Sequence, residues 1–410
     1  MAIQLLSVPL ILKYLGSEKF GLLGVMTTYF FFWGSTDLGL SFGIQNAVPA
    51  YRNSPDQMKR ANASVFFVLS GIGTFLFFSA TVWLLAFNGA THLPFRGVIS
   101  DSDYIYSLLV LFFCFCFNMP LLVASNVLVG FQKGYIPKLS AAAANLIGLG
   151  GLFIGIYARK NIVFIVAASN LPGILSSVMN YIYFYKNAET KYLKLSLHFF
   201  DAPELKKLLK IGLVFWVLSL SSQLMFGWDN IPIAKYLGLE TATKYSIAAR
   251  ITRIFALSAT LFFSPLLPAY NDAFHNKDTQ WLREMTVRNF NRLVAASVLL
   301  LPIVFFGTNT LVYYWVGYKN YFDTDWLWLM YVLIIFLNFN AYVSYIMLSA
   351  PLVKKMLRVY PAAALLSLAG KWYGVQYFGV TGFVFFGVIP YIFIFFGGSV
   401  FYIRKLLRDY

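Results

Sequence analysis

Charged residues are scarce in this sequence. Asp, Glu, Lys and Arg make up 12% of its 410 residues, whereas hydrophobic residues make up 59%. Soluble domains carry roughly 25% charged residues. Long apolar runs, such as residues 64–87 and 293–316, match the roughly 20 residues that a helix needs to cross a bilayer. The composition therefore excludes an ordinary soluble domain and predicts an all-α polytopic membrane protein.

Cysteine and histidine are also scarce, and the few present are badly placed for chemistry. Cys114 and Cys116 lie two residues apart in one apolar stretch, which favours lipid-facing or packed thiols over a disulfide framework or a metal site. His92, His198 and His275 are too dispersed for a zinc-binding helix, and no G-x-x-x-x-G-K-[ST] phosphate loop occurs. We therefore expect no metal, no cofactor and no nucleotide hydrolysis.

Hydropathy predicts eleven spans and part of a twelfth. The eleven lie near residues 20–49, 64–87, 104–130, 138–157, 162–185, 209–236, 243–269, 290–316, 326–350, 358–374 and 380–403. The apolar piece at residues 2–12 is too short to cross a bilayer. We interpret it as the remnant of helix 1, so that the first helix looks incomplete.

The basic residues are distributed unevenly between the two sides of these spans. With the remnant counted as the first helix, the even-numbered connections and the C-terminal tail carry 21 Lys and Arg residues, and the odd-numbered connections carry nine. This bias predicts that the even connections and both termini are cytoplasmic. Anionic membrane lipids then account for most of the net charge of +16, and no nucleic-acid partner is expected.

A short internal repeat divides the chain. KYLG occurs at Lys13–Gly16 and again at Lys235–Gly238, and PAYRN at Pro49–Asn53 is followed later by PAYND at Pro268–Asp272. Two matches in the same order predict two parallel six-helix halves around a central cavity. The halves would span residues 1–185 and 209–410, joined by a cytoplasmic connector at 186–208. Asp201-Ala-Pro-Glu204 has the form of a capping box and predicts a helix start there.

Charges inside the spans are the candidate site residues, because ionisable groups are costly in hydrocarbon. Arg250 and Arg253 lie three residues apart on one helical face, and Asp229 is expected at a similar depth on the preceding span. One carboxylate cannot neutralise two guanidinium groups, and the surplus charge suits a diphosphate. The alternative is a structural ion pair between Asp229 and Arg250, with Arg253 reaching a wet interface.

Two further charges have two interpretations each. Asp37 lies near the middle of an apolar stretch. It is a candidate for binding a coupling proton or sodium ion, or it accepts hydrogen bonds at a helix crossing. Lys371, between Gly370 and Trp372, either contacts substrate phosphate or extends its ammonium group from a helix end to the interface.

Several segments resemble a known family. They are VPLILKYLG, FGLLG, STDLGLSFGIQNAV, NVLVGFQKGYIPKLSAAAANLIGLGGLF, GWDNIPIAKYLGLE and YFGVTGFVFFGVIPYI. These are similar to Wzx-type polysaccharide flippases, in the polysaccharide transporter family of the multidrug/oligosaccharidyl-lipid/polysaccharide exporter superfamily. The resemblance implies translocation of undecaprenyl-diphosphate-linked oligosaccharide, such as an O-antigen unit of lipopolysaccharide. Transport would run by alternating access to the outer leaflet of the bacterial inner membrane, with polysaccharide assembly proteins as partners.

Two other function classes fit parts of the sequence. A membrane-embedded O-antigen polymerase or glycosyltransferase would need a large outer loop or catalytic carboxylates, yet the longest outer connection, residues 88–103, has about 16 residues. A multidrug or cation antiporter of the same superfamily would share the fold, but two arginines within a span favour an anionic substrate. We therefore expect a transporter rather than an enzyme.

Overall fold

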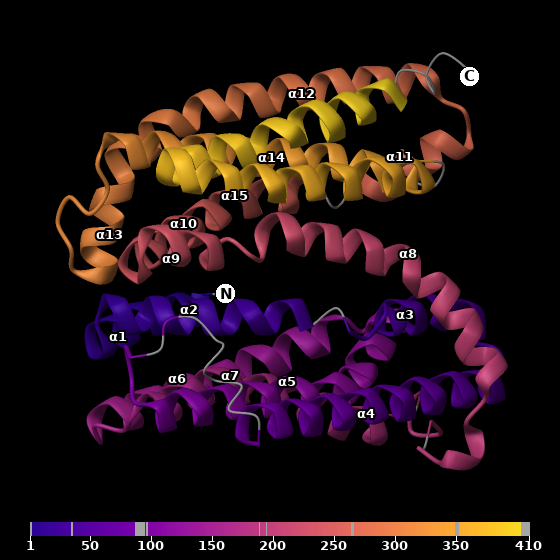
Figure 1. The fold of residues 1–410 in the computed structure, drawn as a ribbon. Helices are drawn as coiled ribbons and strands as arrows, with labels where there is room; N and C mark the ends of the chain where they lie inside the picture. Colours follow the sequence, from indigo (N-terminus) through magenta and orange to yellow (C-terminus); the bar gives the residue numbers. More distant parts are fainter. Residues whose placement is uncertain are drawn as a thin grey trace. The chain divides into compact units, whose positions relative to one another are not determined.

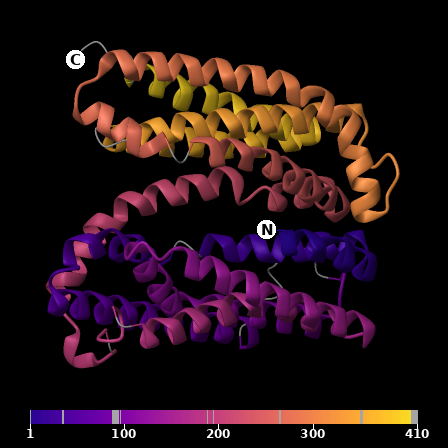
Figure 2. The same ribbon diagram turned by 180° about the vertical axis from the view of Figure 1, so that it is seen from behind.

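The computed structural model describes residues 2–33, 36–86, 95, 97–187, 189–193, 195–263, 266–348 and 352–402. Within these ranges every regular element is a helix, which confirms the predicted all-α class. The chain forms two compact units, Met1–Leu220 and Ser221–Tyr410. In each unit the helices run lengthwise along the bundle (Figures 1 and 2).

Unit 1 is built around α5. Its helices are α1 (Ala2–Leu15), α2 (Ser17–Trp33), α3 (Leu40–Tyr51), α4 (Pro55–Leu85), α5 (Asp101–Gly130), α6 (Tyr135–Tyr157), α7 (Ile162–Lys186), the short η2 (Leu197–Phe199) and the first part of α8 (Ala202–Phe226). Helix α5 packs against α3, α4 and α7, while α6 packs against α7 and α1. Cys114 and Cys116 are buried free thiols in this unit, which agrees with packed rather than lipid-facing thiols.

Unit 2 repeats this arrangement with more often interrupted helices. They are α9 (Asn230–Leu237), α10 (Leu239–Phe263), α11 (Leu267–His275), α12 (Thr279–Pro302), η4 (Ile303–Gly307), α13 (Thr308–Val316), α14 (Thr324–Met347), α15 (Val353–Tyr391) and η5 (Ile392–Phe396). Helix α10 packs against α9 and α14, α9 also packs against α15, and α12 packs against α14.

These helices form twelve candidate membrane segments. Nine helical stretches in the described ranges are long and apolar enough to cross a membrane, and the last of them, Lys354–Tyr402, is two segments joined at Gly379. There φ is +64°, which a helix does not adopt. With α1 and the α2–α3 pair this gives six segments in each half of the repeat, with α8 beginning the second half. Helix α1 has 14 residues, so it is short for a span.

The KYLG repeat has the same structural role in both units. Gly16 follows α1 with φ +81°, and Gly238 follows α9 with φ +88°. Left-handed φ values are accessible mainly to glycine, so the motif ends a helix in each half and starts the next one within a residue. The α2–α3 pair then corresponds to α10–α11, which confirms the parallel repeat.

Some predictions reach residues outside the described ranges. The spans predicted at 20–49, 64–87, 243–269, 326–350 and 380–403 each include such positions, and so does His92. Five of the basic residues behind the sidedness prediction also lie there, namely Arg96, Lys194, Arg404, Lys405 and Arg408.

Helix starts are set by polar caps at the ends of the spans. Ser100 accepts a hydrogen bond from the backbone N–H of Asp103, and Asn161 does the same for Phe164. In unit 2, Asp278 and Asp323 cap α12 and α14 in this way. The first four N–H groups of a helix lack partners within it, so these short side chains fix where each span begins.

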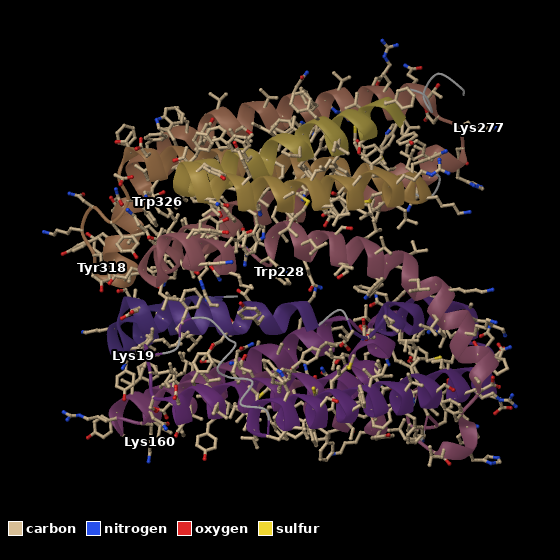
Figure 3. The ribbon with its side chains drawn as sticks, viewed as in Figure 1. Lys19, Lys160, Trp228, Lys277, Tyr318 and Trp326 are labelled. Atoms are coloured by element: carbon tan, nitrogen blue, oxygen red, sulfur yellow. The ribbon has the colours of Figure 1, made fainter. Side chains whose placement is uncertain are left out.

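The ends of each unit agree with the predicted loop assignment. Figure 3 places Lys19 and Lys160 at one end of unit 1, where the Tyr14 hydroxyl donates to the Lys160 carbonyl over 2.7 Å. In unit 2, Lys277 lies at one end and Tyr318 with Trp326 at the other. In unit 2 an odd and an even connection thus occupy opposite ends, and in unit 1 the two labelled odd connections share one end. Which end faces the cytoplasm stays a prediction from the basic residues.

The start of α8 is fastened to unit 1. The Asp201 carboxylate accepts from the Glu204 N–H over 2.9 Å, as the capping motif predicts, and pairs with Arg60 at 2.9 Å. Glu204 does not complete the box, because its carboxylate binds Tyr51 and Lys207 instead.

Close helix packing extends this attachment. Gly39 and Gly212 approach so closely that a side chain on either would collide with the other's backbone. The compact units therefore divide at Leu220, within the helix predicted to begin the second half.

The Asp201 carboxylate makes the attachment of α8 sensitive to pH. Its pKa is lowered below the usual 3.8 by the Glu204 N–H bond and by the Arg60 pair. A lowered folded-state pKa contributes stability above the unfolded-state pKa, and this contribution is lost as pH falls through the folded value. We expect Asp201→Asn to lower the melting temperature at pH 7, and the difference from wild type to shrink below about pH 4. A difference that grows on acidification would contradict this role.

Candidate functional site

A break in an apolar helix organises the candidate site. Helix α8 ends at Phe226 and α9 begins at Asn230, with a turn at residues 227–229 between them. The Gly227 N–H donates to the Gln223 carbonyl over 2.7 Å, and a Cβ at Gly227 would lie 2.8 Å from that same oxygen. Glycine therefore permits the tight exit. The last carbonyls of α8 are left without partners in their own helix, within a stretch whose composition fits a membrane span.

Two cations satisfy these carbonyls. The Lys371 ammonium group, from α15, donates to the Met225 carbonyl oxygen. The Arg253 guanidinium, from α10, donates to the Phe226 carbonyl oxygen over 3.3 Å. The C-terminal end of a helix carries partial negative charge, so both contacts are electrostatically favourable. The break thus gathers positive charge from two other helices.

Asp229 balances one of these charges. Its carboxylate lies 2.6 Å from the Lys371 ammonium, and its other oxygen accepts a 2.6 Å hydrogen bond from the Tyr245 hydroxyl. The side chains of Lys371 and Asp229 are only 9% and 12% exposed. Removing one member of such a pair leaves a desolvated charge and typically costs about 3–5 kcal/mol.

The surroundings of Lys371 hold its side chain in place. The ammonium lies 5.1 Å from the ring centre of Phe383 and 5.8 Å from that of Phe226. A Cβ at Gly387 would lie 2.6 Å from Lys371 Cγ, so this glycine leaves room for the lysine stem. The sequence interpretation that Lys371 extends from a helix end to the interface is wrong, because the residue is buried within α15 and fully engaged.

Arg250 and Arg253 complete the cluster. Arg250 is half-buried and Arg253 is exposed, about 4.5 Å apart along α10. Among the described residues, neither has a carboxylate within 4.0 Å. Asp229 neutralises the charge of Lys371, so the positive charges of both arginines remain without an acidic partner among these residues. Guanidinium groups without a carboxylate partner are candidates for binding an anion, and this role for Arg250 and Arg253 stays a proposal.

The predicted ion pair between Asp229 and Arg250 is wrong. Asp229 contacts Tyr245, and the next residue, Asn230, accepts from the Ser246 hydroxyl over 2.8 Å. This pairing sets Asp229 five residues from Arg250 along α10, or about 7.5 Å. The expectation of similar depth treated the span as one continuous helix. The break at Gly227 shifts the level of Asp229.

The cluster belongs to one half of the repeat. When Gly16 is aligned with Gly238, a shift of 222 residues, the positions equivalent to Asp229, Arg250 and Arg253 hold Ser7, Thr28 and Phe31.

The Thr28 hydroxyl donates a local bond to the Gly24 carbonyl over 2.8 Å. The fold is therefore built in unit 1 without these charges, so the repeat alone does not require them in unit 2.

Asp37 lies in unit 1, far along the chain from Asp229 and Arg250. Its role is also different. Its two carboxylate oxygens accept from the backbone N–H groups of Gly39 and Ser41 over 3.0 and 3.3 Å. It thereby caps α3 where the α2–α3 span is interrupted. Of the two sequence interpretations, the geometry shows hydrogen bonding directly. Coupling-ion binding by Asp37 stays a proposal.

The capping role gives a prediction for Asp37. Asp37→Ala should lower the free energy of unfolding by about 0.5–2 kcal/mol, whereas Asp37→Asn should lower it less, because its amide oxygen still accepts one of the two backbone N–H bonds. Thermal unfolding in detergent measures both. A coupling role predicts instead that the Asn variant folds normally and loses the dependence of transport on a proton or sodium gradient.

The buried pair gives a second prediction. Lys371→Met should destabilise the protein by about 3–5 kcal/mol, because it leaves the Asp229 carboxylate unpaired. Adding Asp229→Asn should recover part of that loss, with a coupling energy of about 0.5–3 kcal/mol. Denaturation of the two single variants and the double variant measures the coupling. Lys355→Met, at an exposed position of α15, is the control, and equal effects of the two lysine substitutions would contradict the pairing.

The sequence did not identify Tyr245 or the two carbonyls of α8 as parts of this site. A usable signal was present, because Gly227-Trp228-Asp229-Asn230 places a glycine and two polar residues inside an apolar run. In the described ranges, no group of three His, Cys, Asp or Glu side chains could hold a metal ion.

The fold and the site together define a multi-pass helical membrane protein with a parallel six-helix repeat and a cation cluster at a broken span. The chain belongs to the polysaccharide biosynthesis protein family, whose sequence pattern matches residues 1–273. No curated protein sequence matches it.

Solved transporters share this fold. An inward-facing multidrug resistance transporter of the MATE family in the MOP superfamily is 15% identical with a TM-score of 0.80, covering 99% of this chain and 96% of its own. The lipid II flippase MurJ is 15% identical with a TM-score of 0.74, covering 99% and 87%. A MOP superfamily transporter from Pyrococcus furiosus is 15% identical with a TM-score of 0.69, covering 99% and 96%.

Proposed function

We propose that this protein is a flippase for undecaprenyl-diphosphate-linked oligosaccharide, which it moves from the cytoplasmic to the outer leaflet of the bacterial inner membrane. The observation that carries the proposal is the surplus charge of Arg250 and Arg253, which have no carboxylate partner among the described residues. Membership of the polysaccharide biosynthesis family supports a sugar-bearing substrate. The O-antigen unit of lipopolysaccharide is the substrate class implied by the sequence resemblance.

A diphosphate matches the two arginines chemically. Each guanidinium presents a planar fork of N–H donors that fits phosphate oxygens and stays protonated at physiological pH. A hydrogen bond to a charged group is typically worth about 1.5–3 kcal/mol net. Two arginines therefore offset part of the cost of bringing a diphosphate into an apolar span. A cationic substrate would meet repulsion instead, which argues against cation antiport.

Lys371 has a different role in this proposal. Two of its three ammonium hydrogens already bind Asp229 and the Met225 carbonyl, so a strong phosphate contact would compete with that pair. Lys371, Asp229 and the Met225 carbonyl together stabilise the turn between α8 and α9, next to Arg250 and Arg253. Transport would proceed by alternating access of a central cavity between the two halves, and polysaccharide assembly proteins would be partners. Each of these points is part of the proposal.

The test is translocation of a fluorescent undecaprenyl-diphosphate oligosaccharide in vesicles, with outer-leaflet lipid read by a membrane-impermeant quencher. Arg250→Ala with Arg253→Ala should slow translocation by about tenfold or more, which corresponds to the loss of about 1.4 kcal/mol. Arg250→Lys with Arg253→Lys should be intermediate, because the charge stays and the fork is lost. Lys354→Ala with Lys355→Ala removes two exposed positive charges elsewhere and serves as the control.

Unchanged translocation in the double Ala variant, with folding intact, would reduce the arginines to structural charges. No translocation in the wild type would favour another substrate or the enzyme alternatives.

A further inference from the structure

A second concentration of positive charge lies on α12, away from the broken helix in the chain. An open groove of about 1140 Å³ follows this helix between Thr279 and Ala295. Its lining includes Arg283, Arg288, Arg292, Glu284, Asn291 and Val287. All six side chains are exposed. The three arginines span nine residues, or about 14 Å of helix.

The arginines of this groove are not neutralised within the described residues. Glu284, the acidic residue of the lining, accepts from the Gln280 amide over 2.9 Å, and no ion pair joins it to an arginine within 4.0 Å. Arg288 donates to the thioether sulfur of Met285, which is a weak acceptor. The groove therefore offers guanidinium donors to a ligand.

The repeat shows that the fold does not need these charges. When the capping residues Ser54 and Asp278 are aligned, Arg288 and Arg292 take the places of Ser64 and Val68 on α4. Ser64 is buried and bonds to the backbone of Asp201.

Basic residues on α4 are also paired with carboxylates. Lys59 lies 3.2 Å from Asp56, and Arg60 lies 2.9 Å from Asp201. The unpaired arginines are thus particular to unit 2.

The position of the groove along α12 indicates the kind of ligand. Arg292 lies 13 residues beyond Thr279, about 20 Å along the helix, where the predicted span has begun. Exposed apolar side chains, including Val294 and Val298, follow directly. A ligand in this groove would meet guanidinium groups at its head and a hydrocarbon surface beyond it. Basic pockets at the predicted cytoplasmic end of a span bind lipid headgroups by this arrangement.

We propose that the groove of α12 binds the phosphate head of an anionic lipid in the cytoplasmic leaflet, through Arg288 and Arg292 with Arg283 beside them. The inference goes beyond the proposed function, because lipid binding here does not require that the protein translocates anything. Two lipids present the same chemistry, namely a membrane phospholipid and a polyprenyl diphosphate. If the diphosphate is preferred, the groove is a first contact site for the proposed substrate.

Native mass spectrometry of the full chain, titrated with phosphatidylglycerol or undecaprenyl diphosphate, tests the site. Diacylglycerol, which lacks phosphate, is the lipid control. The protein carries Arg250→Ala and Arg253→Ala throughout, so that binding at the broken helix does not mask the groove. Arg288→Gln with Arg292→Gln should weaken binding of at least one phosphate lipid by about tenfold or more. The matched control, Lys354→Gln with Lys355→Gln, removes the same charge and should bind like its parent.

The outcomes distinguish the two lipids from each other and decide whether the groove is a binding site. Preferential loss of undecaprenyl diphosphate assigns the groove to substrate, and loss of phosphatidylglycerol assigns it to membrane phospholipid; both support the site. Equal loss in the control variant, or no loss in the groove variant, overturns it. A photo-crosslinking phosphatidylglycerol and a matching diphosphate lipid should also label residues 279–295 of the chain without any substitution. Labelling only elsewhere would overturn the proposed site. None of these results depends on whether translocation occurs.

Discussion

The rest of the site depends on the interruption of α8 at Gly227. Backbone carbonyls that lose their helical partners in a membrane must find donors, since each unsatisfied group costs several kcal/mol in hydrocarbon. Lys371 and Arg253 supply those donors from two other helices. Asp229 lies directly after the same turn and balances the lysine. A local loss of hydrogen bonding thus explains why three ionisable groups gather around one break in an apolar span.

The two halves show how a repeated fold acquires a site in only one copy. Both use a KYLG motif with a left-handed glycine, and both interrupt the span that follows. In unit 1 that second interruption is capped by Asp37 through backbone N–H groups alone. Ser7 and Thr28 stand where unit 2 has Asp229 and Arg250. The shared features therefore serve folding, while the charges that differ are free to serve binding.

Much of this architecture could be predicted from the sequence because it depends on local patterns. Apolar run length gave most of the spans, two short motifs gave the repeat, and the Asp201 capping motif gave the start of α8. The pairing of Asp229 with Lys371 could not be predicted, because 142 residues separate them and no periodicity links them. The depth of Asp229 was misjudged because a single glycine turn resets the register. The division at Leu220 depends on the close packing of α3 and α8 at Gly39 and Gly212, which hydropathy does not report.

The lysine and the arginines near the break in α8 differ in how readily they can bind a ligand. Lys371 is desolvated but fully paired, so exchanging its partners for a ligand would first cost the Asp229 contact. Arg250 and Arg253 have no carboxylate to give up, so an anion that reaches them gains charge-assisted hydrogen bonds with little loss. The guanidinium group is also the more weakly hydrated cation. Under the proposed function, Lys371 and Arg253 satisfy the backbone carbonyls at the break, and the remaining N–H donors of Arg250 and Arg253 would favour a phosphate ligand over a cation.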